Sequence, residues 1–158
     1  MRSSTGRATD RAVSRTCIFC RVAAGELPGN IVHRDDRVLA FLDVSPLMLG
    51  HVLVIPVAHV DTLDDLPREL GGPLFEVVRR MSIAVQRALG AGGSFVAINT
   101  RLSQSVPHLH VHVVPRLEGD GLFSPRPIWK RRSYGDDAEA AEYARKIKAA
   151  YAAVSAGR

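Results

Sequence analysis

Residues 108–112 alternate histidine with apolar residues, and this pattern has more capacity for chemistry than any other in the chain. His108, His110 and His112 are three of the six histidines. Side chains alternate between the two faces of a β-strand, so a strand over 108–114 would place the three imidazoles on one face, about 6.5 Å apart. Imidazoles titrate near neutral pH and act as nucleophiles, proton donors or metal ligands. The spacing therefore predicts a reactive row of histidines rather than an ordinary solvent-facing strand.

The two cysteines form a second candidate site. Cys17 and Cys20 have Cys-x-x-Cys spacing and are the only cysteines in the sequence. Inside a cell such a pair favours metal binding or redox work over a structural disulfide. A thioredoxin-like site needs a βαβ context, which the sequence does not show. Structural zinc, held by cysteine and histidine ligands, is the reading we prefer, and two reduced cysteines in a packed segment are the alternative.

These residues need a scaffold, and the sequence predicts one of class α+β. Apolar and β-branched segments predict five short strands, at 31–33, 38–42, 51–55, 94–98 and 108–114. Most of them follow one another without a helix between, which favours an antiparallel sheet. A short helix is expected over 17–24.

Two longer helices are predicted. Apolar residues at a 3.6-residue period indicate a helix over 73–89, with Pro73 at its first position and Gly90 at its C-cap. A second amphipathic helix is expected from about 136 to 154, acidic at its start and basic in its later half, as the helix dipole favours.

Composition limits the class of protein. The chain has 158 residues, 46% of them hydrophobic, and a net charge of +5. No segment approaches the ~18–20 apolar residues of a membrane span, and the basic N-terminus lacks the apolar core of a secretory signal. We therefore expect a cytoplasmic protein with no membrane partner.

The basic surface suits anions such as nucleotides, and without a basic patch interleaved with aromatic residues we do not expect nucleic-acid binding. Residues 1–15 are expected to be a disordered basic tail.

The sequence resembles the histidine-triad family of nucleotide hydrolases and transferases. The family signature, His-φ-His-φ-His-φ-φ with φ apolar, is matched at every position of 108–114. Gln104-Ser105 stands just upstream, and the runs Ala-Phe-Leu-Asp at 40–43 and Gly-His-Val-Leu-Val-Ile-Pro at 50–56 resemble blocks from the first half of the family. The similarity extends from about Cys17 to Arg116. We therefore assign residues 16–118 to a histidine-triad domain and 119–158 to a C-terminal extension with a helix.

The resemblance implies a fold and a set of roles. It implies a five-stranded antiparallel sheet, one long helix and a homodimer. His110 would be the nucleophile that forms a nucleotidyl-histidine intermediate, His112 would face the phosphate, and Ser105 would assist the leaving group. The residues implied to bind substrate are Asn99 and Gln104 at phosphate oxygens, Asp43 at the ribose hydroxyls and Phe19 at the base. Each of these four has a structural alternative, a turn for the polar ones and plain core for Phe19.

The sequence resembles the zinc-bearing bacterial members of the family, and this resemblance implies that the two cysteines bind zinc. We expect one structural zinc per chain, bound by Cys17, Cys20, His51 and His108, and no organic cofactor. His51 opens one predicted strand and His108 opens another, so both could face the cysteines if the strands are neighbours. His33 and His59 have no assigned role.

The function expected from the resemblance is attack at the α-phosphorus of a nucleoside phosphoramidate or related nucleotide conjugate. The expected partner is a purine nucleotide or nucleotide conjugate. Three alternatives remain: a dinucleoside polyphosphate hydrolase or phosphorylase, a nucleotide-binding module with vestigial catalysis, and an enzyme that uses the triad as metal ligands. One feature departs from the family. The loop 100–103, Thr-Arg-Leu-Ser, has no glycine where many relatives carry a longer glycine-rich loop, so the leaving-group preference is open.

Overall fold

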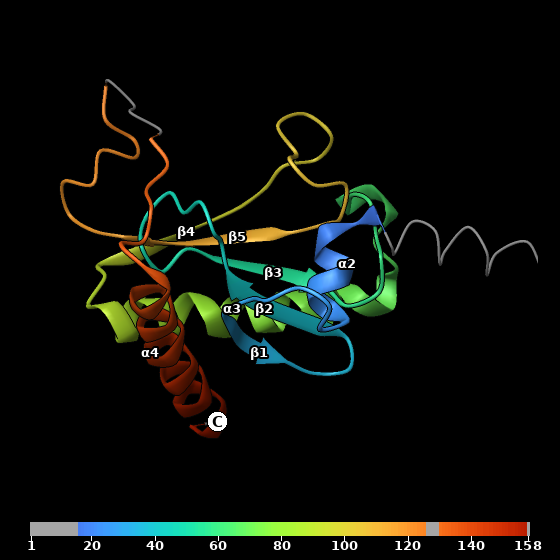
Figure 1. The fold of residues 1–158 in the computed structure, drawn as a ribbon, viewed down its shortest axis with the longest axis horizontal. Coiled ribbons are helices and arrows are strands. Elements are labelled where there is room, and N and C mark those ends of the chain that lie inside the picture. The colour runs from blue at the N-terminus through green and yellow to red at the C-terminus, as the bar shows by residue number, and fades with distance from the viewer. Residues whose placement is uncertain (1–15, 126–129, 158) are drawn as a thin grey trace, which may run out of the picture.

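The structure is a computed structural model that describes residues 16–125 and 130–157 (Figure 1). The expected tail at 1–15 lies outside these residues. Five antiparallel strands form one sheet in the order β1-β2-β3-β5-β4. The strands are β1 (Ile31–Arg34), β2 (Val38–Leu42), β3 (Val52–Pro56), β4 (Gly93–Ile98) and β5 (Val111–Arg116). The predicted fold class is confirmed.

The helices are α2 (Ile18–Ala23), α3 (Arg68–Leu89) and α4 (Asp137–Ala156), with a 3₁₀ turn η1 (Leu63–Asp65) before α3. Helix α3 begins five residues before the predicted start, so Pro73 lies inside it and not at its first position. The prediction was wrong because proline lacks only its own N–H, and a helix that continues on both sides tolerates this locally. Gly90 ends the helix in the left-handed conformation (φ 61°), as predicted.

The two faces of the sheet have different covers, as Figure 1 shows. Alternate residues of the central strands, such as Ala40, Val54 and Val113, pack with α3 and α4 in the larger core. The residues between them, such as Phe41 and Leu53, pack under α2 in a smaller core. Helix α2 is therefore the element that closes the face on which the odd-numbered side chains of β2 and the even-numbered side chains of β5 project.

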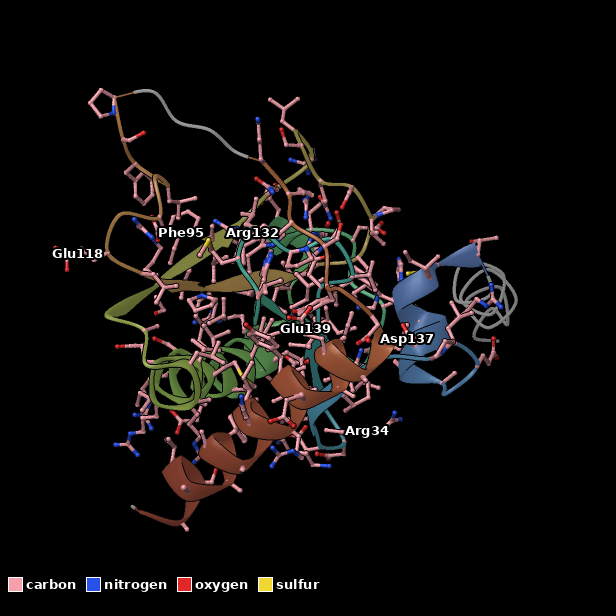
Figure 2. All side chains as sticks on the ribbon, turned by 60° about the vertical axis from the view of Figure 1, so that its left-hand side comes forward. Arg34, Phe95, Glu118, Arg132, Asp137 and Glu139 are labelled. Carbon is pink, nitrogen blue, oxygen red and sulfur yellow. The ribbon has the colours of Figure 1, made fainter. Side chains whose placement is uncertain are left out.

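The C-terminal helix is part of the main core. Ala144, Ile147 and Tyr151 of α4 are buried in the same cluster as α3 and the sheet. Asp136 caps the helix by accepting from the N–H of Glu139. Asp137 and Glu139, labelled in Figure 2, supply negative charge in the first turn. Among the described residues, no helix has the length and apolar character that crossing a bilayer requires.

Gly50 lies in a turn that packs against both α3 and α4. Its φ is +89°, and a Cβ there would lie 2.3 Å from Cδ1 of Leu89 and 3.4 Å from Cδ1 of Tyr143. Only glycine fits this position, which fixes the turn immediately before His51.

Candidate active site and metal centre

The triad histidines lie where β5 begins and runs beside β3. His112 is on β5 opposite Leu53 of β3, whereas His108 and His110 precede the strand, which starts at Val111 rather than at His108. The alternation predicted for the segment holds through this irregular stretch. Leu109 belongs to the larger core with Val111, and all three imidazoles are buried on the opposite face.

The hydrogen bonds of His110 define its reactive atom. Nδ1 of His110 lies 2.7 Å from the backbone oxygen of His108, and a carbonyl oxygen only accepts. The proton of His110 is therefore on Nδ1, and the lone pair is on Nε2. The ring is only 2% exposed and meets the edge of Phe19 from α2 at 5.3 Å between centroids. A neutral imidazole with a fixed tautomer and a fixed ring plane meets the requirement for a nucleophile.

A second chain of hydrogen bonds fixes the tautomer of His112. The N–H of Leu47 donates to Nδ1 of His51 at 3.2 Å, so the proton of His51 is on Nε2. That Nε2 lies 3.0 Å from Nδ1 of His112 and donates to it. The remaining proton of His112 is then on its Nε2. Within the described part of the chain this Nε2 is the buried side-chain atom that has no hydrogen-bond partner.

An orphaned buried donor next to a nucleophile indicates a place for an acceptor. The rings of His110 and His112 are 4.9 Å apart between centroids, so an oxygen bound to the atom that His110 attacks lies within reach of His112. A phosphoryl group offers such an oxygen, and a donor aimed at it stabilises the charge that develops there.

His51 and His112 are both held in the neutral form. Burial lowers the pKa of His51 to about 3, with further contributions from His112 and Arg131. Burial also lowers the pKa of His112 to about 4, and His110 and Arg131 add to the effect. These lowered pKa values agree with the hydrogen bonds, which require each ring to be neutral, with one donor and one acceptor nitrogen.

Asp43 lies directly after β2 and is 8% exposed. Its Oδ1 accepts from the N–H of Ser45 at 2.9 Å, and its Oδ2 accepts from Nη1 of Arg131 at 3.0 Å. Oδ2 is also 3.4 Å from Nδ1 of His51, so the carboxylate predicted to hold ribose borders the His51–His112 pair.

The loop between β4 and the triad carries the other predicted substrate residues. Asn99 follows β4 and is half-buried, and Ser105 is exposed. The amide of Gln104 is engaged within the loops, since Oε1 accepts from the N–H of Arg101 and Nε2 donates to the backbone oxygen of Asp61. Its predicted phosphate contact therefore requires these bonds to be exchanged.

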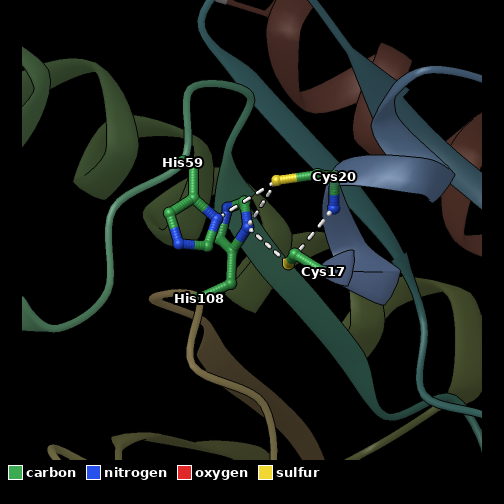
Figure 3. A group of neighbouring side chains, drawn as sticks. All are labelled: Cys17, Cys20, His59 and His108. Atoms are coloured by element: carbon green, nitrogen blue, oxygen red, sulfur yellow. Dashed lines mark hydrogen bonds between the residues drawn. The ribbon is translucent and has the colours of Figure 1, made fainter. Parts of the chain in front are cut away.

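The cysteines meet two histidines at the other end of β3 (Figure 3). Sγ of Cys17 is 3.4 Å from Nδ1 of His108, and Sγ of Cys20 is 3.2 Å from Nδ1 of His59 and 3.5 Å from Nδ1 of His108. Ligands of a tetrahedral zinc, with Zn–S about 2.3 Å and Zn–N about 2.05 Å, lie about 3.6 Å apart. The four side chains therefore fit that metal.

The outer nitrogens of both histidines support this fit. Nε2 of His108 donates to the backbone oxygen of Pro56, and Nε2 of His59 lies 2.8 Å from Oδ1 of Asp61. Each ring thus keeps its lone pair on the Nδ1 that faces the sulfurs. Metal-bound histidines usually have such a partner on the second nitrogen.

The prediction of His51 as the fourth ligand was wrong. His51 groups with Asp43 and His112, and His59 takes the place beside the cysteines. The register explains the error. Strands β3 and β5 are antiparallel and pair Leu53 with His112, so the start of β5 lies at the end of β3. His51 precedes β3 and reaches His112, whereas His108 lies at the far end, near His59.

A family model described as the HIT domain matches residues 24–119. The chain belongs to the HIT family. A solved zinc-bound HIT protein from Mycobacterium smegmatis aligns with a TM-score of 0.79 at 34% identity, over 92% of this chain and 99% of that one.

Two HIT relatives have names that state an activity. The adenylylsulfatase HINT3 of Arabidopsis thaliana is 31% identical over 142 residues, 89% of this chain and 72% of that protein. An asymmetrical bis(5'-nucleosyl)-tetraphosphatase of Schizosaccharomyces pombe is 38% identical over 93 residues, 57% of this chain and 50% of that protein. The family is thus one of nucleotide-binding hydrolases and transferases.

Three residues of this HIT site had no predicted role. His59 follows the end of β3 and, like His51, has an odd number, so the alternation of side chains could have suggested that it faces the same side of the sheet. Arg131 and Tyr134 lie in the extension, and Tyr134 accepts from the N–H of Gly50 at 3.1 Å. Their contacts with a loop more than eighty residues away have no signal in local sequence.

Proposed function

We propose that this HIT protein is a nucleotidyl hydrolase or transferase that attacks the α-phosphorus of a purine nucleotide conjugate through His110. The observation that carries the proposal is the pairing of a lone pair on Nε2 of His110 with an unpartnered donor on Nε2 of His112. The two atoms supply the two things that phosphoryl transfer needs, a positioned nucleophile and a donor for the charged oxygens.

The reaction runs in two displacements. Nε2 of His110 forms a bond to phosphorus while the bond from phosphorus to the leaving group breaks. The leaving group takes a proton from the hydroxyl of Ser105, which regains one from solvent. The phosphorylated ring carries positive charge, which the bond from Nδ1 to the His108 carbonyl stabilises. Water or another acceptor then attacks phosphorus, releases the nucleotide and restores His110. The donor on His112 serves the phosphoryl oxygens in both steps.

The substrate contacts of the proposal are those named from the sequence. Asp43 accepts the ribose hydroxyls, since a carboxylate has lone pairs for a vicinal diol beyond those used by Ser45 and Arg131. Asn99 and Gln104 bind phosphate oxygens. Phe19 is 7% exposed, so its contribution is limited to an edge beside the base and to support of the His110 ring.

Zinc is proposed as a structural component at Cys17, Cys20, His59 and His108. A four-ligand site leaves no position for water, so the metal would supply rigidity rather than a nucleophile. The closeness of the two thiols and two imidazoles and the zinc-bound relative support this assignment.

A homodimer is also proposed, as the family resemblance implies. Strand β4 forms an edge of the sheet and exposes Val96, and α3 exposes Phe75. An open edge and exposed apolar side chains favour association through a two-fold axis. Light scattering at micromolar concentration tests this, and a monomer mass contradicts it.

The experiment that tests the function is a substrate panel with the zinc-loaded full chain, scored by AMP release. Adenosine phosphoramidate, adenylyl sulfate and diadenosine tetraphosphate differ in the leaving group and share the attacked phosphorus. Turnover of at least one, lost in His110→Ala, supports the proposal and names the preferred leaving group. No turnover of any of them, with AMP still bound, would support the nucleotide-binding module instead.

A further inference from the structure

Residues 131–134 cross the loop that joins β2 to β3, and we call them the strap. Nη1 of Arg131 donates to Asp43 and to the backbone oxygen of Ser45. The N–H of Arg132 donates to the backbone oxygen of Pro46 at 2.6 Å, and the strap ends at Tyr134, which accepts from the N–H of Gly50. Figure 2 shows Arg132 in the segment that leads back towards α4. The strap lies outside residues 24–119, which match the HIT model.

The carboxylate of Asp43 is fixed from two sides. The N–H of Ser45 holds Oδ1 at 2.9 Å, and Arg131 holds Oδ2 at 3.0 Å. A carboxylate with one oxygen held can still rotate about its last bond, whereas with both held its free lone pairs point in fixed directions.

Arg131 also resolves an electrostatic conflict. Nδ1 of His51 accepts from Leu47 and so presents no proton to Oδ2 of Asp43, which is only 3.4 Å away. Two acceptors at that distance repel each other, and the guanidinium on the same Oδ2 offsets the repulsion. Without it, Asp43 would turn away or draw a proton onto His51.

We propose that Arg131 is a positioning residue, which holds the Asp43 carboxylate in the orientation that accepts the 2'- and 3'-hydroxyls of a bound ribonucleotide. The strap from the C-terminal extension thereby completes the nucleotide site of the HIT domain and sets its preference for ribose over deoxyribose. This inference rests on the proposed function, in which Asp43 binds ribose.

The contacts of Arg131 favour action through Asp43 over direct binding of phosphate. Its guanidinium nitrogen already donates to a carboxylate and a carbonyl, and both acceptors belong to the loop after β2. A direct phosphate contact would have to come from Nε or Nη2, while Nη1 stays bound to this loop. The two possibilities differ in a measurable way, because a phosphate contact strengthens binding of ribonucleotides and deoxyribonucleotides equally.

The test is calorimetric binding of AMP and 2'-deoxy-AMP to the zinc-loaded full chain. Loss of hydrogen bonds to a charged group predicts that the wild type binds AMP about tenfold or more tightly than the deoxynucleotide. Arg131→Ala is expected to reduce this preference at least about threefold, with little change in deoxynucleotide affinity, and Arg131→Lys, which keeps one donor, to restore part of it.

Two further variants make the result specific. Arg132→Ala is the matched control, because Arg132 contributes its backbone N–H to the strap, which alanine keeps, and lines a hollow with Tyr143 and Lys146. It should keep the wild-type preference. In an Asp43→Asn background, Arg131→Ala should cause no further loss, because the carboxylate through which it acts is gone.

The outcomes separate the inference from the function. An equal loss of affinity for both nucleotides in Arg131→Ala assigns Arg131 to phosphate and overturns the positioning role, as does an unchanged preference. Tighter AMP binding in Arg131→Ala shows that Arg131 blocks the diol site and also overturns it. A wild type that binds neither nucleotide contradicts both the proposed function and this inference.

Discussion

The backbone oxygen of His108 accepts the Nδ1 proton of His110 at 2.7 Å, while the side chain of His108 faces two cysteine sulfurs. One residue therefore belongs to both sites, with its ring in the Cys/His cluster and its carbonyl on the nucleophile. A metal that fixes the ring would also fix the carbonyl that sets the tautomer of His110. The proposed zinc would therefore be a structural metal that also helps to hold His110 in its reactive tautomer.

The metal assignment can be tested with two histidine variants. His59→Asn removes a proposed ligand and is expected to weaken zinc binding at least 10- to 100-fold, because three ligands remain. His51→Asn removes a more deeply buried histidine from the other end of β3 and should leave zinc content unchanged. Elemental analysis of purified protein after dialysis checks both. Zinc retained in His59→Asn and lost in His51→Asn would restore the ligand set expected from sequence.

Stability is expected to depend on pH through His51. Its folded pKa of about 3 lies below the usual value of 6.5, so the unfolded chain binds a proton that the folded chain does not. This contribution is complete above about pH 6.5 and is lost as the pH falls towards about 3. Between about pH 7 and about pH 5 the loss is about 2 kcal/mol.

Urea unfolding of wild type and His51→Asn at several pH values measures this contribution. Protonation of metal ligands and of other groups affects both proteins, so the difference between them isolates His51. The wild type should lose more free energy of unfolding on acidification than the variant. Parallel pH profiles for the two proteins would show that His51 is not held neutral by the fold.

The glycine-free loop contains two residues with positive φ, Arg101 at 64° and Ser103 at 60°. Such residues cost roughly 1–2 kcal/mol outside glycine. Arg101→Gly and Arg101→Ala both remove the ion pair with Asp64, and only glycine relieves the backbone. We expect the glycine variant to be about 1 kcal/mol more stable than the alanine variant in urea unfolding. Equal stabilities would mean that the loop relaxes out of this conformation.

Sequence patterns were sufficient for the scaffold because its elements depend on local periodicity. Alternation along 108–113 correctly separated the core residues Leu109, Val111 and Val113 from the histidines, even though the regular strand begins only at Val111. Helix α4 and its acidic start followed from charge and spacing. The start of α3 was misjudged because proline is a strong but not absolute signal for a first turn.

The error at His51 arose at a different level. Two strands that are antiparallel have their starts at opposite ends, so His51 and His108 could not both reach Cys17. That conclusion needs the pairing of β3 with β5, which local sequence does not specify. The contact of Arg131 with Asp43 is still harder to predict from sequence, because it joins residues 88 positions apart, in a loop and a strap without regular structure.

The proposed reaction requires a bond between Nε2 of His110 and phosphorus, and a search for that bond tests it. A turnover mixture quenched in alkali and digested should contain a peptide in which His110 carries a nucleotidyl group, and mass spectrometry would locate it. His110→Ala should lose both the adduct and turnover while retaining AMP binding. His33→Ala, which changes a histidine of β1 whose ring contacts Tyr151, should lose neither. An adduct on another residue, or normal turnover in His110→Ala, would contradict the account.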